Sequence, residues 1–324
     1  MGRIERFAAV SVLLCLGVAA AADEPLGTYT CYRAVEPIVI DGVLEYAWVD
    51  LPQAGLFKNI PDTPGWTPAT IALMLWDDQW LYVAVFCEDH DLYATYLNHD
   101  DPLWTQDVVE VFIMHQDSTE GHYLEWEVSP RGTTFDTYVT HPSPGLQSIL
   151  SWTSGFTAAT RYAGALDDPG GDMDSVVEMA IPWSDIYDDP SAHPADGAVL
   201  RMNLYRIDYD TPAVPGGTGT NARLLAFSPT LCGSFHTPDR FGEVTFLRAV
   251  APDHRLAGDA DGDRDVDLDD FVLLKQNFGL TAGAAWNQGD FDHDGAVTLD
   301  DFAILKQNFG TDLDRVLAAG TGLP

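Results

Sequence analysis

Short apolar runs with a two-residue alternation dominate the chain between residues 34 and 248. They are rich in Val, Ile, Tyr, Phe and Trp and are separated by Gly, Pro and Asp turns, which is typical of β-strands. Clear examples are Ile71–Trp76, Trp80–Glu88, Val108–Met114, Tyr123–Val128, Ser175–Ile181 and Val199–Ile207. Since no stretch here has sustained helical periodicity, we predict a mainly β domain, an antiparallel β-sandwich of immunoglobulin-like or jelly-roll-like type.

The C-terminal part has a different pattern, and it repeats. Residues 267–279 return 31 positions later as residues 298–310 with few changes. Apolar residues recur at helical spacing, namely Leu268, Phe271, Leu274 and Phe278, then Leu299, Phe302, Leu305 and Phe309. Gly279 and Gly310 stand where helix C-caps are expected. We therefore predict a small all-α domain of two short helices that pack on each other through these apolar residues.

An acidic loop of twelve residues precedes each predicted helix, at 259–270 and 290–301. Calcium takes six to eight oxygen ligands, which such a loop supplies from positions 1, 3, 5, 7, 9 and 12. The predicted ligands are Asp259, Asp261, Asp263, Asp265, Asp267 and Asp270, then Asp290, Asp292, Asp294, Ala296, Thr298 and Asp301. Carboxylates crowded this closely repel one another without a cation, so we expect two calcium ions whose binding is coupled to folding. Val266 and Val297, at loop position 8, are expected to pack between the loops.

The repeat resembles a type I dockerin, an EF-hand-like module. The resemblance implies docking onto a cohesin-type protein in extracellular polysaccharide-degrading assemblies. The chain departs from the family pattern at Arg264, where loop position 6 is usually glycine. It also departs at loop positions 10 and 11, which are Leu-Asp in both copies instead of small hydroxyl residues. A calcium-locked end piece is therefore the alternative to a cohesin-binding module.

The charge and the N-terminus limit the partners. The formal net charge is −34, which disfavours nucleic acid and anionic membrane surfaces as partners. Residues 1–22 have the charged start, short apolar run and Ala-Ala-Ala end of a signal peptide, so we expect a secreted, extracellular protein. The predicted boundaries are then 23–250 for the sandwich, 251–258 for a linker, 259–310 for the repeat and 311–324 for a tail.

Three cysteines remain after the predicted cleavage: Cys31, Cys87 and Cys232. An odd number in an oxidising compartment permits one disulfide with three pairings. Cys87 lies in an apolar strand pattern and is expected to be a buried thiol, which makes Cys31 with Cys232 the natural pair.

Ordered landmarks in the β region carry a second resemblance. They are residues 40–48, 75–83, 104–112, 177–183 and 228–242. Together they resemble a family 9 carbohydrate-binding module, a β-sandwich attached to polysaccharide-degrading enzymes. The family holds a sugar between two aromatic side chains, which map onto Trp104 and onto Phe235, where the family has tryptophan. Glu110 and Glu127 are the candidate hydrogen-bonding partners of the sugar hydroxyls. The resemblance also implies a structural calcium near Asp41 and Glu45.

Each of these aromatic residues could instead have a purely structural role. Trp104 and Phe235 could be core residues, although both stand in polar, Pro-containing or Gly-containing segments. Trp48, Trp76, Trp126 and Trp183 lie in apolar strand patterns and are expected in the core.

We predict a non-catalytic carbohydrate-binding protein. The alternatives are a glycoside hydrolase using a carboxylate pair and a haem-binding or other small-ligand-binding sandwich, with Met114 and His115 or His236 as axial ligands.

Overall fold

The computed structural model describes residues 24–34, 38–44, 46–48, 51–60, 67–115, 121–142, 146–168, 173–187, 189–210, 218–251, 258–263, 265–292 and 294–310. The chain divides into two compact units, residues 1–251 and residues 252–324. Several predictions fall outside the described residues: the signal peptide 1–22, Glu45, the linker residues 252–257, Arg264 and the tail 311–324.

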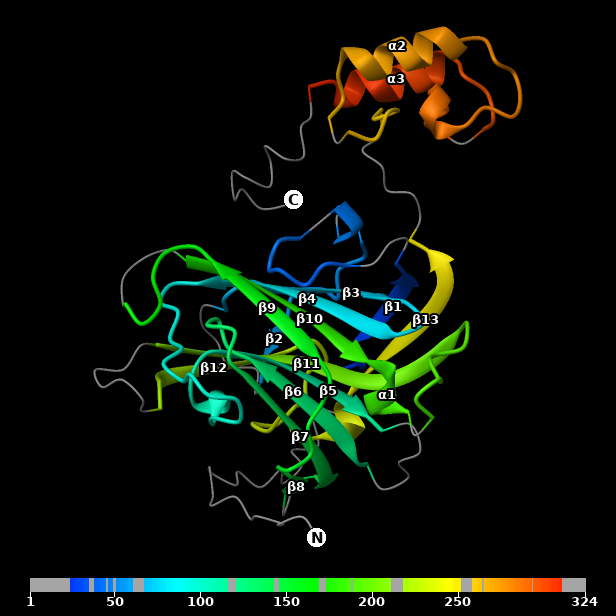
Figure 1. The fold of residues 1–324 in the computed structure, drawn as a ribbon. Helices are drawn as coiled ribbons and strands as arrows, with labels where there is room; N and C mark the ends of the chain where they lie inside the picture. Colours follow the sequence, from blue (N-terminus) through cyan, green and yellow to red (C-terminus); the bar gives the residue numbers. More distant parts are fainter. Residues whose placement is uncertain are drawn as a thin grey trace. The chain divides into compact units, whose positions relative to one another are not determined.

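The first unit is built almost entirely of strands (Figure 1). They are β1 (Thr28–Arg33), β2 (Lys58–Asn59), β3 (Thr70–Trp76), β4 (Trp80–Asp89), β5 (Val108–Met114), β6 (Tyr123–Val128), β7 (Thr134–His141), β8 (Gln147–Ile149), β9 (Thr157–Tyr162), β10 (Met173–Pro182), β11 (Ala198–Asp210), β12 (Thr220–Ala226) and β13 (Gly242–Val250). Short helical turns connect them: η1 (Tyr46–Trp48), η2 (Leu103–Thr105), α1 (Trp183–Ile186) and η3 (Pro238–Arg240).

The strands form two layers that pack on each other, as predicted. The hydrogen-bonded order is β8-β7-β6-β5-β11-β13-β1-β3-β4-β10-β9, with β12 on β11 and β2 on β12. The long strand β11 connects the layers, because residues 198–202 pair with β13 while residues 202–207 pair with β5. The prediction of an antiparallel arrangement is wrong around β1, which runs parallel to both β13 and β3. These pairs join strands that are distant along the chain or separated by a long connection, so no tight hairpin signals them in the sequence.

The main core lies between the two layers. One side of it comes from alternate residues of β5 and β6, such as Val109, Val111 and Trp126, and the other from β3, β4 and β10. The four tryptophans predicted in the core are confirmed as buried: Trp48, Trp76, Trp126 and Trp183. Because side chains alternate along a strand, β5 and β6 also present a second face, away from this core. That second face carries its own cluster of buried residues.

Two features of the first unit differ from expectation or add to it. The expected pairing of Cys31 with Cys232 is wrong, since no disulfide joins the described cysteines Cys31, Cys87 and Cys232, and Cys31 is buried in the core between the layers. Arg206 of β11 is also buried there, where it donates to Asp89 at 2.6 Å and Asp208 at 2.8 Å. It donates as well to the Glu88 carbonyl of β4, so the guanidinium ties the two layers together.

The second unit contains α2 (Leu268–Asn277), η4 (Trp286–Gln288) and α3 (Leu299–Asn308). Both α-helices begin with capping boxes, from Asp267 and from Thr298, which explains why they start at equivalent positions. Gly279 and Gly310 have positive φ just beyond the helix ends, as predicted for C-terminal caps. The helices are in contact, and the Phe271 and Phe302 rings lie 5.9 Å apart.

The predicted packing face of these helices is only partly right. Leu274 and Leu305 are buried, and so are Val266 and Val297 in the same cluster. Leu268 and Leu299, however, are 66% and 71% exposed, and Phe278 and Phe309 are also exposed. Phe278 and Phe309 follow the last helical residue and have non-helical backbone, so they leave the helical face, while Leu268 and Leu299 are the first residues of their helices. Among the described residues, no helix is both long and apolar enough to cross a membrane.

Candidate functional site

A single row of side chains crosses four strands on the second face of β5 and β6. Glu110 of β5 pairs directly with Glu127 of β6. Glu127 pairs in turn with Phe135 of β7, and Glu110 with Tyr205 of β11. The row Phe135–Glu127–Glu110–Tyr205 thus has two carboxyls in the centre and an aromatic ring at each end. Three interstrand spacings give it a length of about 14 Å.

The two predicted sugar platforms lie at opposite ends of this row. Trp104, on η2, is partly buried, and its ring meets that of Phe135 edge to face at 5.4 Å. Phe235 stacks flat on Tyr205 at 4.1 Å, and its carbonyl accepts a hydrogen bond from the Tyr205 hydroxyl at 2.9 Å. Only 8% of Phe235 is exposed. Trp104 is therefore the more accessible platform, and one face of the Phe235 ring is already occupied by Tyr205.

The carboxyls between the platforms are buried and close to one another. Glu125 joins Glu110 and Glu127, because it lies two residues before Glu127 on β6 and faces the same side. Burial raises the pKa of Glu125 to about 7. Burial, and then the charges of the neighbouring carboxyls, raise the pKa of Glu110 and of Glu127 well above the usual value. Burial disfavours the ionised form of each carboxyl, and the neighbouring acids disfavour it further, so this cluster has a stability cost that grows as the pH rises.

His236 borders the same cluster. Its Nδ1 is hydrogen-bonded to the Tyr123 hydroxyl at 2.5 Å and lies 3.9 Å from a Glu125 oxygen. Burial lowers the pKa of His236 to about 4, so the ring is neutral at physiological pH and offers no charge to Glu125. Sequence reasoning missed Glu125 and Tyr123 as members of the site. The signal was present, since residues 123, 125 and 127 share one face of a strand by their two-residue spacing.

The arrangement suits a ring-shaped polar ligand. Aromatic faces accept C–H groups, while carboxyl oxygens in the floor accept hydrogen bonds from hydroxyls or amines. A haem site with Met114 and His115 as the two ligands is disfavoured, because these adjacent residues continue β5 and so alternate between its faces. His236 is engaged with Tyr123. In the part of the chain that the structure describes, no group of side chains that could hold a metal ion is found here.

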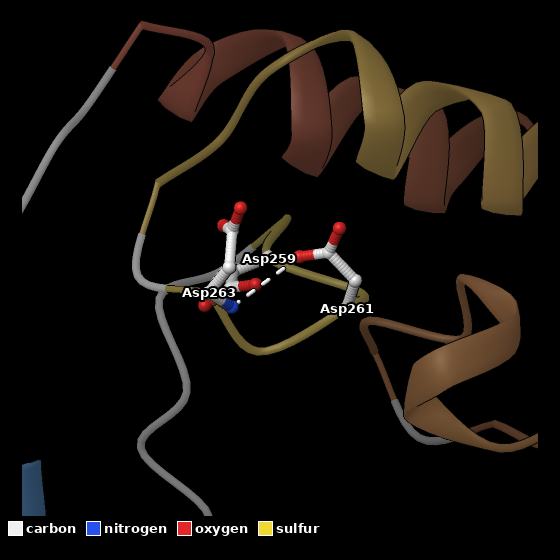
Figure 2. A group of neighbouring side chains, drawn as sticks. All are labelled: Asp259, Asp261 and Asp263. Atoms are coloured by element: carbon white, nitrogen blue, oxygen red, sulfur yellow. Dashed lines mark hydrogen bonds between the residues drawn. The ribbon is translucent and has the colours of Figure 1, made fainter.

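The acidic loops of the second unit do bring carboxylates together. In the first loop Asp259, Asp261 and Asp263 each offer a carboxylate oxygen, and these oxygens lie within 4.8 Å of one another. Figure 2 shows the three side chains. Asp265, Asp267 and Asp270 form a second such group in the same loop. In the other loop the group is Asp290, Asp292 and Asp294. The three groups together hold every predicted carboxylate ligand except Asp301.

Several ligand positions also have a structural role that is visible in the hydrogen bonds. Asp270 Oδ1 accepts from Ala260 N at 2.6 Å, and Asp301 Oδ1 accepts from Phe291 N at 2.7 Å, so each closes its own loop. Thr298 caps α3, and Ala296 N donates to Asp294 at 2.7 Å. Asp290 Oδ1 is buried and has no hydrogen-bond donor among the described residues. A buried carboxylate oxygen without a donor fits a cation ligand, so the residues present are compatible with calcium.

The predicted structural calcium near Asp41 has only partial support in the geometry. The backbone N–H groups of Asp41 and Gly42 donate to Glu178 Oε2, at 3.2 and 2.7 Å. Asp41 Oδ1 accepts from Val43 N at 2.9 Å. Glu178 thus holds this turn directly. The second expected ligand, Glu45, lies outside the described residues.

Comparisons with known proteins bear on the first unit. The family described as "Carbohydrate family 9 binding domain-like" matches residues 40–248. A solved structure of a carbohydrate-binding protein from Bacteroides uniformis is similar, with a TM-score of 0.51 and 15% identity over 68% of this chain and 100% of that one. No curated protein matches the chain.

Two solved structures of a family 9 carbohydrate-binding module from Caldicellulosiruptor kristjanssonii are also similar. The complex with cellotriose has a TM-score of 0.45 and 19% identity, over 69% of this chain and 98% of that one. The complex with glucose has a TM-score of 0.46 and 18% identity, over 69% and 99%.

Proposed function

Because the chain belongs to the family 9 carbohydrate-binding domain-like proteins, we propose that its first unit binds a saccharide on the second face of β5, β6 and β11. One observation carries the proposal, namely the row of side chains described above. Trp104 and Phe235 contact the aromatic residues at its two ends, and Glu110 and Glu127 lie in its centre. The sugar ring stacks on Trp104, and its hydroxyl groups donate to the carboxyl floor.

The experiment is a binding titration of the purified protein with soluble oligosaccharides, cellotriose among them. The parent is compared with Trp104→Ala and with Glu110→Gln. Binding that is weakened in both variants while both remain folded, as shown by cooperative melting, supports the proposal. Binding that neither change affects would place the sugar elsewhere.

The second unit is proposed to bind two calcium ions through its two loops. The support is the convergence of Asp259, Asp261 and Asp263, that of Asp290, Asp292 and Asp294, and the buried Asp290 oxygen that lacks a donor among the described residues. When bound, calcium neutralises the clustered carboxylates. The chain's own residues position the loops, since Asp270 and Asp301 hold the backbone N–H groups of their loops. Calorimetry with a chelated sample tests this directly.

Assembly and export complete the proposal. We propose a secreted protein whose dockerin-like repeat joins it to other extracellular polysaccharide-degrading proteins through a cohesin-type partner. The support is the internal duplication together with the exposed, twofold-repeated side chains of Leu268 and Leu299. Pull-down with immobilised cohesin domains in calcium, and again in chelator, is the test. No capture in calcium would favour a calcium-locked end piece instead.

A hydrolase is the second candidate, because two carboxyls face each other at Glu110 and Glu127. Glycosidases need one carboxyl ionised and the other protonated. Here burial raises the pKa of both groups, which favours a binding site over a catalytic pair. Release of reducing sugar that disappears on Glu110→Gln or Glu127→Gln would establish the hydrolase instead.

A further inference from the structure

We propose that the carboxyl row between Trp104 and Phe235 selects a cationic sugar, a saccharide with a free ammonium group such as a glucosamine oligomer, over the neutral sugar of the same shape. The inference rests on the proposed function and names the ligand class for the same site. It starts from a cluster of buried acids that has no cationic partner among the described residues. Three buried carboxyls, Glu110, Glu125 and Glu127, share one face of β5 and β6.

The strongest observation concerns Glu127. It is 1% exposed, and its side-chain oxygens have no N–H or hydroxyl donor among the described residues; its one side-chain contact of this kind is with the carboxyl of Glu125, another acid. A buried carboxyl without a donor costs free energy unless a partner arrives. Its cross-strand neighbours are Glu110 and Phe135, so its own sheet supplies no donor side chain at that level.

The opposite face of the same sheet shows how this chain treats buried acids elsewhere. There Asp89 and Asp208 are paired with Arg206 at 2.6 and 2.8 Å. Arg223 adds a second cation to Asp208, at 2.6 Å. On the Glu127 face, within the described part of the chain, the basic side chain nearest a carboxyl of the cluster is His236, 3.9 Å from Glu125, and burial holds it neutral. A cationic partner for these acids, which the described residues do not supply, is therefore expected from the ligand.

A metal ion fits this place less well than an ammonium group. Among the described residues, the groups of carboxylates close enough to share one ion all lie in the second unit. An ammonium group needs no such convergence, because its three N–H donors point in different directions and reach separate carboxyls. Aromatic faces also attract cations, which adds Trp104 to the favourable contacts.

The path to the carboxyls runs past Glu125 and His236. Their side chains are 8% and 28% exposed, whereas Glu110 and Glu127 are 2% and 1% exposed, so this edge is the less deeply buried part of the cluster and the side from which we expect a ligand to approach. Binding of an ammonium group there favours the ionised form of the carboxyls, whose pKa values burial has raised. Protons are then released on binding near neutral pH, which a neutral sugar does not cause.

The test is isothermal titration of the full chain with three trisaccharides of one backbone geometry: the glucosamine trimer, the N-acetylglucosamine trimer and cellotriose. We expect the glucosamine trimer to bind at least tenfold more tightly than the other two, with proton release detected by changing the buffer. Glu127→Gln is expected to remove most of that preference. Glu243→Gln, the same change of charge at an exposed position of β13, is the matched control.

Each outcome decides the matter. Equal affinity for the three trimers overturns the selection of a cationic sugar and leaves the proposed sugar site intact. An equal loss in Glu127→Gln and Glu243→Gln also overturns it, because long-range attraction to a protein of net charge −34 would then explain the preference. No binding of any saccharide, in glycan-array controls as well, would mean that the proposed function itself fails.

Discussion

Glu110 and Glu127 face each other directly across the antiparallel pair β5–β6. Two buried carboxyls in that relation are unfavourable for folding, since burial and the neighbouring acid both disfavour the ionised form of each group. The two carboxyls lie between aromatic side chains at both ends of their row, and a sugar ring can stack on such aromatic surfaces. The pair is therefore the part of the first unit that packing alone does not explain.

Removal of the accessible platform is expected to weaken saccharide binding. Trp104→Ala takes away a large stacking surface, worth roughly 1.5–3 kcal/mol when an aromatic side chain is buried, and so lowers affinity about tenfold to a hundredfold. Affinity electrophoresis and calorimetry measure the loss. Tyr162→Ala, at an exposed aromatic residue on β9, is the control and should bind normally.

The stability of the first unit should fall as the pH rises through the titration of Glu125. In the folded state burial raises its pKa to about 7, above the unfolded value near 4.3. The folded state then binds more protons between these values, so the stabilisation is complete below pH 4.3 and is lost as the pH approaches and passes 7. In Glu125→Gln the unfolding free energy should depend less on pH. The fall between pH 5 and 8 should be smaller than in the parent by an amount on the order of 2 kcal/mol.

Thermal melts of parent and variant at a series of pH values measure that difference, and groups common to both proteins cancel. Glu243→Gln provides the control at an exposed site. Parallel curves for parent and Glu125→Gln would contradict the assignment of a raised pKa to this group.

Arg206→Met is expected to destabilise the first unit strongly. It leaves Asp89 and Asp208 buried without their common partner, and breaking a buried pair in this way costs about 3–5 kcal/mol. Arg33→Met removes an exposed pair with Asp78 and should cost at most about 1 kcal/mol. Urea unfolding of the two variants gives the comparison, and equal losses would contradict the role of Arg206 in joining the layers.

Calcium should order the second unit in a way that Trp286 reports. Its indole N–H donates to the Asp259 carbonyl at the start of the first loop, and the ring is mostly buried against Phe291 at the start of the second. Chelation should therefore shift the indole NMR signal of Trp286 and reduce helix content. Asp290→Asn should weaken the response, whereas Asp300→Asn, on the exposed side of α3, should preserve it. An identical Trp286 signal with and without calcium would sink the proposal.

The sequence was sufficient for features that depend on local spacing. The alternation in β5 and β6, the capped helices and the buried core tryptophans all follow from residues close together in the chain. Glu110 and Glu127 could be nominated in this way, but their direct opposition could not, because it depends on the register of β5 against β6. The sequence also did not predict that β1 pairs in parallel with β13 and β3, or that Arg206 forms an ion pair with Asp89. Both contacts join residues that are far apart in the sequence.

The exposure of side chains at the site also lay beyond sequence reasoning. Trp104 and Phe235 both stand in loops with turn-forming residues, yet one is partly exposed and the other is covered by Tyr205. The difference arises because Tyr205 lies on β11, a strand brought beside β5 only by the tertiary fold.

The most direct measurement of the central claim is a titration of the protein with oligosaccharides while the indole signal of Trp104 is followed by NMR. We predict that this signal moves in proportion to the bound fraction, and that Glu110→Gln weakens binding without lowering the melting temperature. Saturable saccharide binding with an unmoved Trp104 signal would contradict the proposed site.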